Sequence, residues 1–493
     1  IAISAGKVSA LATRLLGRGG GTALPGLVAQ TVYPGVLRDI TRQLPAGSLV
    51  VSGTNGKTTT TRMLGSILEA AGLVPLHNRS GSNLERGLIS ALVEAASPAG
   101  SLPRRYRSGL FEVDEAAMPA VLGAVKPKVL LLNNLFRDQL DRYGELDTIY
   151  SKWRAALHRL SPAAALVLNA DDPAIAALSL APNLRARTIT FGVGDSRYAL
   201  GELPHAADSI SCPRCNSRLE YDQVLLSHLG HWSCPQCGLA RPRPDICAER
   251  IRLNGTDSSQ LHLSTPQGKL EIELRVPGFY NVYNALAAVS AALAFGVSLD
   301  HIKLGLESFT AAFGRIERVP IPGEGDRSLL MALVKNPVGF NEVIRMLFPL
   351  EDEGREVVDG GWWTVDGGRR GGDSIGSGGR HLFIIINDLI ADGRDVSWLW
   401  DVDFETLATA PQGVARVGVA GIRADDMAVR LKYAGVDTAL IHVDRSLDGG
   451  LEAAISKLPT GQTLYVLPTY TAMLEFRKML YGRGWVGSQF WED

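Results

Sequence analysis

A short glycine-containing stretch has the residues and the spacing of a phosphate-binding loop. It lies between the apolar pair Leu49-Val50 and a helical pattern, and it reads Gly53-Thr54-Asn55-Gly56-Lys57-Thr58-Thr59. A strand, a glycine loop and a helix N-terminus in this order direct backbone N–H groups and a helix dipole at an anion. We expect Lys57 to reach the β- and γ-phosphates and the Thr58 hydroxyl to ligate Mg²⁺. The stretch therefore predicts a site for a nucleoside triphosphate.

The alternative is a glycine-rich turn before an ordinary helix. Only Thr54 and Asn55 separate the two glycines, so the spacing is tighter than in the common G-x-x-x-x-G-K-[ST] pattern. The Lys-Thr pair at the start of a helix favours phosphate binding, because both side chains have a defined role there.

Four of the five cysteines have the spacing of a zinc site. They form two C-P-x-C turns that are separated by 18 residues, Cys212/Cys215 and Cys234/Cys237. Each turn places two thiolates on one side of a metal ion, and the two turns complete a closed tetrahedral shell. A closed shell has no position for a reactive water, so we expect a structural Zn²⁺. Two disulfides are the alternative, and Cys247 is expected to be a small buried residue.

Polar residues follow several apolar runs, where parallel strands would end. Glu112 ends one run and is our candidate for a second Mg²⁺ ligand, because carboxylates at this edge of a doubly wound sheet lie beside the phosphate loop. A solvated acidic turn is the alternative. Residues 133–144 and 169–173 follow the next runs. Asp138 in the first segment could cap a helix, and the acids of the second could hold a ribose or form an Asx turn.

The pattern predicts an α/β protein with two successive units. Residues 1–48 are expected to pack on the ATPase domain, and the stretch 1–29 within them is expected to form an amphipathic helix. Apolar runs alternate with amphipathic segments over 49–313, which predicts a mainly parallel sheet with helices on both faces. The zinc-ribbon insertion is expected at 204–244. A C-terminal Rossmann-like α/β domain is expected at 314–493, with a flexible glycine-rich loop at 351–380.

Smaller segments complete this outline. Period-two alternation over 261–276 predicts a β-hairpin, and an alanine-rich pattern predicts a helix over 281–296. The strand candidates of the second domain are 329–334, 381–386, 416–420, 438–442 and 463–467.

Composition excludes several classes of protein. The 493 residues are 46% hydrophobic and 20% charged, and a net charge of −1 gives no electrostatic case for nucleic acid. No apolar run approaches the ~18–20 residues of a membrane helix. The first 29 residues could suggest a signal peptide, but Lys7 and Arg14 interrupt them, and the absence of an initiator Met suggests a trimmed chain. With reduced cysteines, we expect a cytoplasmic protein.

The order of the motifs resembles that of the Mur ligases. These enzymes form amide bonds by phosphorylating a carboxylate with ATP and letting an amine attack the acyl phosphate. The resemblance implies their central P-loop ATPase fold and covers roughly residues 49–319, with the second unit matching more loosely. After the phosphate loop and the acid Glu112, it rests on Asp138-x-Leu140-Asp141-Arg142, Asn169-Ala170-Asp171-Asp172-Pro173, Asn281-x-x-Asn284-Ala285-Leu286-Ala287-Ala288 and Gly314-Arg315.

Departures from the usual pattern point to one branch of the family. Gln139 stands where the family usually has the histidine of Asp-His-Leu-Asp, and only about fifty residues precede the phosphate loop, too few for the family's UDP-binding domain. These departures, the four-Cys insertion and residues 387–398 resemble an amidating branch that works with a GatD-like glutamine amidotransferase subunit. The loop at 351–380 looks like an addition to that pattern.

The resemblance implies ATP-dependent amidation of the D-glutamate α-carboxylate in the peptidoglycan stem peptide on lipid II, which gives D-isoglutamine. Ammonia would come from a glutaminase partner in a heterodimer or larger assembly at the inner face of the membrane. The residues also favour a partner, because a common glutaminase needs a Cys nucleophile with a His. Four cysteines have a metal-site spacing, and Cys247 has no His near it in a recognisable motif.

Two other functions stay open at this point. A Mur- or folylpolyglutamate-like ligase would add an amino acid to the carboxylate instead of ammonia. A zinc-ribbon nucleic-acid binder with a vestigial ATP site would show affinity for DNA or RNA that falls steeply with salt.

The resemblance also assigns residues beyond the phosphate loop. Asn83 would lie near the γ-phosphate, Asn281 and Asn284 near adenine, and Arg315 near the phosphates once the domains close. Many members of the family have a carbamylated lysine that bridges a second Mg²⁺. Lys152 is nearby in the sequence but does not align cleanly, so it is not assigned.

The acid-rich segment 387–405 contains a candidate for contact with the partner. Its acids flank Trp398 and Trp400, and tryptophans beside charges are typical of interface anchors. A solvated acidic loop is the alternative. The resemblance suggests that an aspartate here orients the histidine of the partner's glutaminase, which indicates Asp395 first and Asp392 second.

Overall fold

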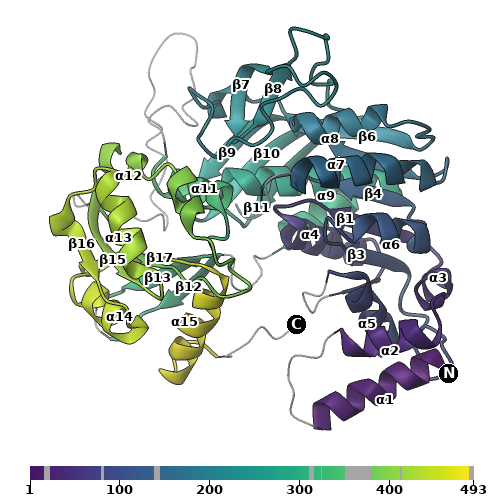
Figure 1. The fold of residues 1–493 in the computed structure, drawn as a ribbon, viewed down its shortest axis with the longest axis horizontal. Helices are drawn as coiled ribbons and strands as arrows, with labels where there is room; N and C mark the ends of the chain where they lie inside the picture. The colour runs from purple at the N-terminus through teal and green to yellow at the C-terminus, as the bar shows by residue number, and fades with distance from the viewer. Residues whose placement is uncertain are drawn as a thin grey trace.

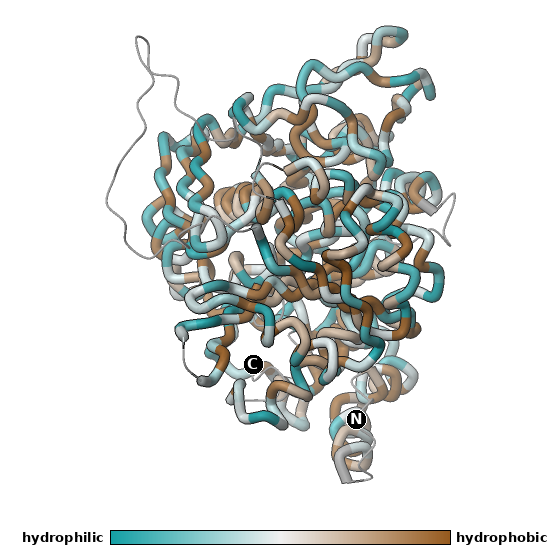
Figure 2. The backbone as a smooth tube through the Cα atoms, turned by 90° about the vertical axis from the view of Figure 1, so that its left-hand side faces the viewer, coloured by the Kyte–Doolittle hydropathy of each residue, from teal (hydrophilic) through white to brown (hydrophobic). Residues whose placement is uncertain are grey.

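Two β-sheets organise the chain (Figure 1). The computed structural model describes residues 1–15, 23–78, 83–137, 145–309, 316–323, 325–349, 379–410 and 413–487. The segment 351–380, predicted to be a flexible loop, therefore lies almost entirely outside the described residues. Figure 2 shows that hydrophobic stretches run through the middle of the molecule.

The first sheet has nine strands in the order β11-β10-β9-β6-β5-β4-β1-β3-β2. Pairing is parallel from β2 to β9 and antiparallel in β9-β10-β11, so the predicted parallel sheet and the predicted hairpin are both present. Every residue of β1, β4 and β5 is buried, as expected for strands covered on both faces. The strands are β1 Ser48–Ser52, β2 Pro75–His77, β3 Ser108–Glu112, β4 Val129–Leu132, β5 Ala165–Asn169, β6 Arg187–Val193, β9 Ile246–Asn254, β10 Ser258–Thr265 and β11 Gly268–Leu274.

Helices cover both faces of this sheet and form two separate cores. On one face lie α4 Lys57–Ala70, α9 Phe279–Phe295 and α10 Leu299–Glu307. On the other lie α5 Glu85–Ala95, α6 Met118–Val125 and α7 Glu145–Ala156. The short α8, Pro173–Ala177, follows β5.

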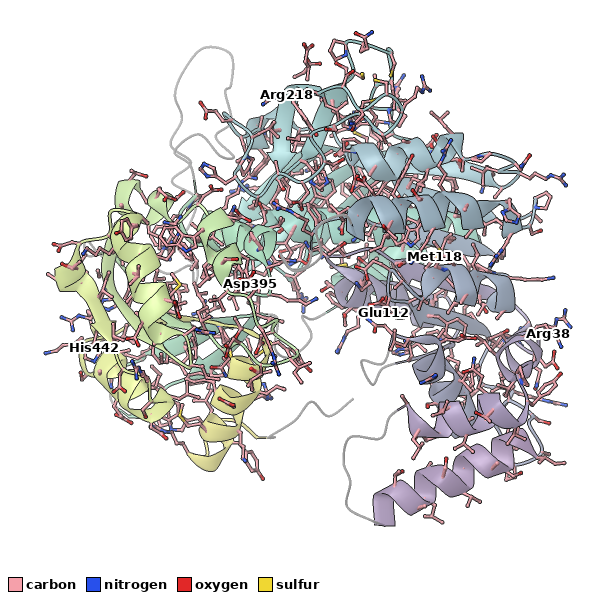
Figure 3. The ribbon with its side chains drawn as sticks, in the orientation of Figure 1. Arg38, Glu112, Met118, Arg218, Asp395 and His442 are labelled. Atoms are coloured by element: carbon pink, nitrogen blue, oxygen red, sulfur yellow. The ribbon has the colours of Figure 1, made fainter. Side chains whose placement is uncertain are left out.

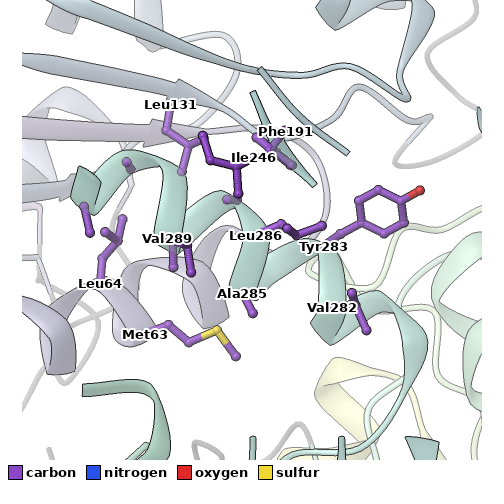
Figure 4. Packing of buried hydrophobic residues seen from close by; sticks show 14 of the residues in the cluster. Met63, Leu64, Leu131, Phe191, Ile246, Val282, Tyr283, Ala285, Leu286 and Val289 are labelled. Atoms are coloured by element: carbon purple, nitrogen blue, oxygen red, sulfur yellow. The ribbon is translucent and has the colours of Figure 1, made fainter. Parts of the chain in front are cut away.

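Helix α9 is the predicted alanine-rich helix, and it is buried along almost its whole length. Small side chains let it lie close to both α4 and the sheet, where Val289 and Leu286 meet Met63 and Leu131 (Figure 4). Because α9 follows the hairpin directly, this packing places its first turn beside the phosphate loop.

The described residues of the N-terminal segment form three helices, and two of them begin within the stretch 1–29, where a single helix was predicted. These are α1 Ala2–Leu15, α2 Leu24–Val32 and α3 Val36–Thr41. Helix α1 packs on α2 and α5, and Ile3 and Leu37 enter the same core as α5. None of the helices in the described part of the chain combines the length and apolar character that a membrane crossing requires.

The second sheet has six strands in the order β12-β13-β17-β14-β15-β16, and all pairs except β12-β13 are parallel. Helices α11–α13 cover one face, and α14 and α15 cover the other. The elements are β12 Ile316–Pro320, β13 Ser328–Ala332, α11 Pro337–Leu347, β14 Arg380–Ile385, α12 Glu405–Thr409, β15 Val414–Ala420, α13 Ala424–Tyr433, β16 Ile441–Val443, α14 Leu447–Ser456, β17 Thr463–Pro468 and α15 Tyr470–Gly482.

One predicted strand in this unit was partly wrong. Thr438–Leu440 form a 3₁₀ turn, and the strand begins only at Ile441. The Asp437 carboxylate accepts a hydrogen bond from the Ala439 N–H at 2.9 Å, which stabilises the turn at the expense of the extended chain.

Helix α11 holds the two units together. Its residue Arg345 is buried and donates to the backbone oxygens of Leu225 and Tyr198 in the first unit, both at 2.6 Å. Its guanidinium also lies over the Phe279 ring, 4.9 Å from the centroid. Val338 of the same helix enters the core of the first unit. The two units are therefore in direct, partly buried contact.

The four-Cys segment forms a small hairpin, β7 Glu220–Leu226 and β8 Leu229–Ser233, at the edge of the first unit. All four sulfur atoms lie within 4.8 Å of one another, and the thiols are free, so the disulfide alternative is not what the structure contains. Burial raises the pKa of Cys212 to about 12, whereas hydrogen bonds with Ser217 lower that of Cys215 to about 6. A cation at the centre would stabilise all four thiolates, so this set fits a tetrahedral zinc ion.

We expect about one Zn²⁺ per purified chain. Cys234→Ser should remove most of the metal and lower the melting temperature by about 5 °C, because the remaining thiolates lose their counter-ion. Metal analysis and thermal unfolding measure both effects.

Cys247→Ser is the matched control, because Cys247 lies half-buried in β9 outside the cluster. It should leave the zinc content unchanged. A zinc-free wild-type protein, or equal metal loss in both variants, would rule out the ribbon.

Candidate functional site

The phosphate loop joins β1 to α4 as predicted. Gly53 and Gly56 have φ angles of 141° and 79°, which residues with a side chain rarely adopt. A Cβ atom on Gly56 would lie 1.9 Å from Asn284 Oδ1, so glycine is required there for space as well. The loop thus has the backbone conformation that exposes N–H groups to an anion.

Amide side chains that follow β4 clamp the loop. Asn134 accepts from the Asn55 N–H at 2.8 Å and donates to the Asn55 carbonyl at 3.0 Å, and Asn133 donates to the same carbonyl at 3.0 Å. Thr54 exchanges hydrogen bonds with the Phe136 backbone. The beginning of the polar segment predicted after β4 therefore fixes the loop, whereas residues 138–144 lie outside the described part of the chain.

Lys57 is buried at the first turn of α4. Its Nζ lies 3.1 Å from Glu115 Oε2 and 3.3 Å from the Thr54 carbonyl oxygen. Glu115 is also largely buried, and burial raises the pKa of this carboxyl while Lys57 opposes the rise. In this structure, Glu115 therefore neutralises the cation that we assign to the phosphates. Glu115 was not among the site residues predicted from the sequence, although it lies three residues after Glu112.

Thr58 and Glu112 meet beside Lys57. The Thr58 hydroxyl donates to Glu112 Oε1 at 3.1 Å. The Asn78 side chain fixes the backbone of Glu112: its Nδ2 donates to the Glu112 carbonyl at 2.8 Å, and its Oδ1 accepts from the Glu112 N–H at 3.0 Å. Figure 3 shows Glu112 on the side of the first unit that faces the second. A hydroxyl and a carboxylate are hard oxygen ligands, so this pair fits Mg²⁺.

Two buried amide atoms at the loop have no hydrogen-bond partner among the described residues. They are Asn55 Nδ2 and Asn133 Oδ1. Buried polar atoms usually have a partner, so both are available to a bound polar ligand.

The remaining predicted nucleotide contacts have different surroundings. The Asn83 carbonyl accepts from the Asp114 N–H at 2.9 Å, which places Asn83 beside the end of β3 and near Glu112. Arg315 lies outside the described residues. Thr59 is buried in the first turn of α4.

Asn281 and Asn284 are both buried on α9. Asn284 donates to Asn281 Oδ1 at 3.0 Å and accepts from Thr60 at 3.3 Å, and Asn281 donates to the Pro277 carbonyl at 2.6 Å. Asn284 therefore packs against the phosphate loop at Gly56. Contact with adenine, as the resemblance implied, remains a prediction.

The acids of residues 169–173 have structural partners. Asp172 caps α8 by accepting from the Ala174 and Ile175 N–H groups, and it also accepts from the Leu135 N–H at 2.9 Å. Asp171 accepts from Val193 N–H, Tyr283 and Arg241. Both carboxylates are fully buried, so the ribose-binding alternative was wrong and the capping turn is confirmed.

The second unit also reaches the phosphate loop. Asn336 caps α11 by accepting from the Gly339 N–H at 2.9 Å, and its Nδ2 donates to Asn55 Oδ1, also at 2.9 Å. Asn336 was not among the site residues predicted from the sequence. The Asn-Pro pair after a strand was an available signal for the cap, but the contact with Asn55 depends on how the units pack.

The acid-rich segment 387–405 contains both buried and exposed groups. Asp392 is buried and accepts from both the N–H and the hydroxyl of Thr471 at the start of α15. Asp395 is half-buried and accepts from the Ser397 N–H at 2.8 Å, and hydrogen bonds with Ser397 lower the pKa of its carboxyl. Asp395 is thus an ionised group at the surface of the second unit (Figure 3), whereas Asp392 is part of its structure.

Known protein families match this chain over both units. The model of the Mur ligase middle domain matches residues 51–219, and that of the MurT ligase C-terminal domain matches residues 374–473. Among solved structures, a pseudomurein peptide ligase type C from Methanothermus fervidus has a TM-score of 0.63 at 19% identity, over 89% of this chain and 78% of its own. MurF from Acinetobacter baumannii has a TM-score of 0.62 at 19% identity, over 94% and 80%. These likenesses confirm the predicted fold.

Curated relatives match the chain over nearly its whole length. The lipid II isoglutaminyl synthase (glutamine-hydrolyzing) subunit MurT of Staphylococcus aureus is 30% identical over 489 residues, 99% of each chain. The subunit of the same name from Streptococcus pneumoniae is 30% identical over 98% of this chain and 97% of its own. This chain therefore belongs to the MurT family within the Mur ligases.

Proposed function

We propose that this ATP-dependent ligase amidates the D-glutamate α-carboxylate of the peptidoglycan stem peptide on lipid II, giving D-isoglutamine through an acyl phosphate. The observation that carries the proposal is the pairing of Thr58 with Glu112 beside Lys57, in a chain that matches curated lipid II isoglutaminyl synthase subunits end to end. Mur ligases use ATP and Mg²⁺. In this chain the phosphate loop with Lys57 fits ATP, and the pair Thr58 and Glu112 fits Mg²⁺.

The groups at the loop have distinct roles in this proposal. The positive-φ glycines present backbone N–H groups to the phosphates. Lys57 leaves Glu115 and contacts the transferring phosphoryl group, whose charge it stabilises. Thr58 and Glu112 would hold Mg²⁺, which would supply positive charge opposite the phosphates. A carboxylate is a poor electrophile because oxide would have to leave, whereas the acyl phosphate releases phosphate when ammonia attacks.

Ammonia would come from a GatD-like glutamine amidotransferase subunit. Four of the five cysteines of this chain are in the ribbon cluster, and burial raises the pKa of Cys247, which disfavours the thiolate that a glutaminase needs. The curated relatives are named as subunits of a glutamine-hydrolysing enzyme, which also supports a partner.

The second unit offers a surface for that partner. Trp398 is in the core, whereas Trp400 is exposed and its ring lies 5.8 Å from that of the exposed Tyr433. Ile390 is also exposed, between β14 and Asp395. Trp400 and Ile390 lie on either side of the ionised Asp395 in the sequence, and exposed apolar side chains in a charged segment are typical of an interface. We place the contact here and assign to Asp395 the orientation of the partner's histidine.

A ligase that adds an amino acid is the remaining alternative within this chemistry. It would release ADP in response to an amino acid, without a partner and without ammonia. The chain itself would act beside the membrane as a peripheral protein, because its proposed substrate is linked to a lipid.

Lys57→Ala should lower amidation by the isolated chain at least about 100-fold, because the transferring phosphoryl group loses its cation. The assay supplies ATP, Mg²⁺, ammonium and a stem-peptide substrate, and it measures isoglutamine by mass spectrometry. The exposed Lys457 provides the control variant Lys457→Ala, which should retain full activity. Near-normal turnover of Lys57→Ala would remove the phosphate-loop assignment, and product formation only with an added amino acid would favour the alternative.

Asp395→Asn should reduce glutamine-driven amidation at least about tenfold in the complex with the partner, because a neutral amide no longer fixes the histidine. Amidation with concentrated ammonia should be largely retained, since the phosphate loop lies in the other unit. Asp222→Asn, at an exposed site on the ribbon, is the control. If both activities fall equally, or if neither falls, Asp395 does not have this role.

A further inference from the structure

We propose that the outer face of helix α1 binds a membrane surface that contains anionic phospholipid. The proposal deepens the proposed function, because a lipid-linked substrate requires the enzyme to work at such a surface. It rests on two independent observations, the distribution of apolar side chains on α1 and the charge of the surrounding segment.

Helix α1 buries Ile3 and two small residues but leaves two large aliphatic residues exposed. Its inner face contacts α2 and α5 and contains Ala2 and Gly6, both buried. A Cβ atom on Gly6 would lie 3.0 Å from both the Pro25 carbonyl oxygen and a methyl carbon of Val93, so the helices approach closely there. On the other side, Val8 is 67% exposed and Leu11 is 59% exposed.

The exposed aliphatic pair differs from what an ordinary surface helix shows, although Ile3 of the same helix does face the core. Such a helix turns its aliphatic stripe toward the core and its polar residues toward water. Val8 and Leu11 are three residues apart and so lie on one face of the helix. Helix α2, which packs beside α1, adds the exposed side chains of Leu24 and Val32. Exposed apolar side chains on two packed helices indicate a surface that binds another molecule.

The charge of this region is opposite to that of the rest of the chain. Residues 1–45 contain five basic residues and one acidic residue, a net charge of +4, whereas residues 46–493 have 45 basic and 50 acidic residues, a net charge of −5. The basic residues are Lys7, Arg14, Arg18, Arg38 and Arg42.

A neighbouring loop adds three more exposed cations. The segment between α5 and β3 contacts the N-terminal helices, since Ser4 donates to the Pro98 carbonyl at 3.1 Å and Gln43 donates to the Gly100 carbonyl at 2.8 Å. The same segment contains the exposed Arg104, Arg105 and Arg107. An exposed apolar helix face in a segment of net positive charge is the combination that binds at the interface of an anionic bilayer.

The positive charge selects this occupant over the alternatives. A second copy of the chain would bring two basic surfaces together, which is unfavourable. The glutaminase partner is assigned to the second unit, and Figure 1 shows α1 at the outer edge of the first unit, beyond α2 and α5.

The test is vesicle co-sedimentation of the full-length protein. Vesicles of phosphatidylcholine with phosphatidylglycerol should bind it, vesicles of phosphatidylcholine alone should bind it several-fold less, and added salt should weaken the binding. The double variant Val8→Glu/Leu11→Glu should bind at least about tenfold less. The control Leu304→Glu/Val443→Glu changes exposed aliphatic residues elsewhere and should bind like the wild type.

Three results would overturn the proposal. These are absence of binding by the wild-type protein, equal binding by the α1 double variant, and a wild-type dimer that the α1 substitutions dissociate without any effect on vesicles.

Amidation of a lipid-free stem peptide with ammonia separates this proposal from the proposed function. That activity should be unchanged in the double variant. If the wild-type protein binds vesicles but lacks this activity, the proposed function is refuted and the membrane-binding surface is supported. If it has the activity but does not bind vesicles, the membrane-binding surface is refuted and the proposed function is supported.

Discussion

The hydrogen bonds that hold the Asn55–Gly56 turn are the constraint on which the site depends. Asn133 and Asn134 fix the Asn55 peptide from β4, Asn284 fills the space beside Gly56, and Asn336 reaches Asn55 from the second unit. Groups from both units thus set one turn in a conformation that glycine alone adopts easily. Lys57 and Thr58 follow this turn directly and take their positions from it, so the chemistry depends on the packing of both units.

Much of the fold could be predicted because local signals agreed with the final packing. Buried strands such as β4 and β5 read as short apolar runs, and the alanine-rich pattern of α9 indicated close packing. The C-P-x-C turns placed the four cysteines together. The strand predicted over 438–442 was partly wrong because a side-chain hydrogen bond from Asp437 stabilises a turn, and periodicity does not detect such a bond.

The candidate site was predictable only in part. Lys57, Thr58 and Glu112 were found because each belongs to a strand-end motif. Glu115 was missed because its role depends on the direction of a turn after β3. Asn336 was missed because its contact with Asn55 joins two units across 281 positions of sequence. On sequence grounds the two acids after β5 could hold a ribose or form an Asx turn, and burial with hydrogen bonds to protein groups makes them structural.

The transfer of oxygen from the substrate to phosphate tests the central claim most directly. The measurement uses a stem peptide with ¹⁸O in the D-glutamate α-carboxylate, together with ATP, Mg²⁺ and ammonium, and analyses the released phosphate by mass spectrometry. An acyl phosphate retains one carboxylate oxygen on phosphorus when ammonia displaces the phosphate. The account therefore predicts one ¹⁸O in the phosphate for each isoglutamine formed. Isoglutamine formed together with unlabelled phosphate would contradict it.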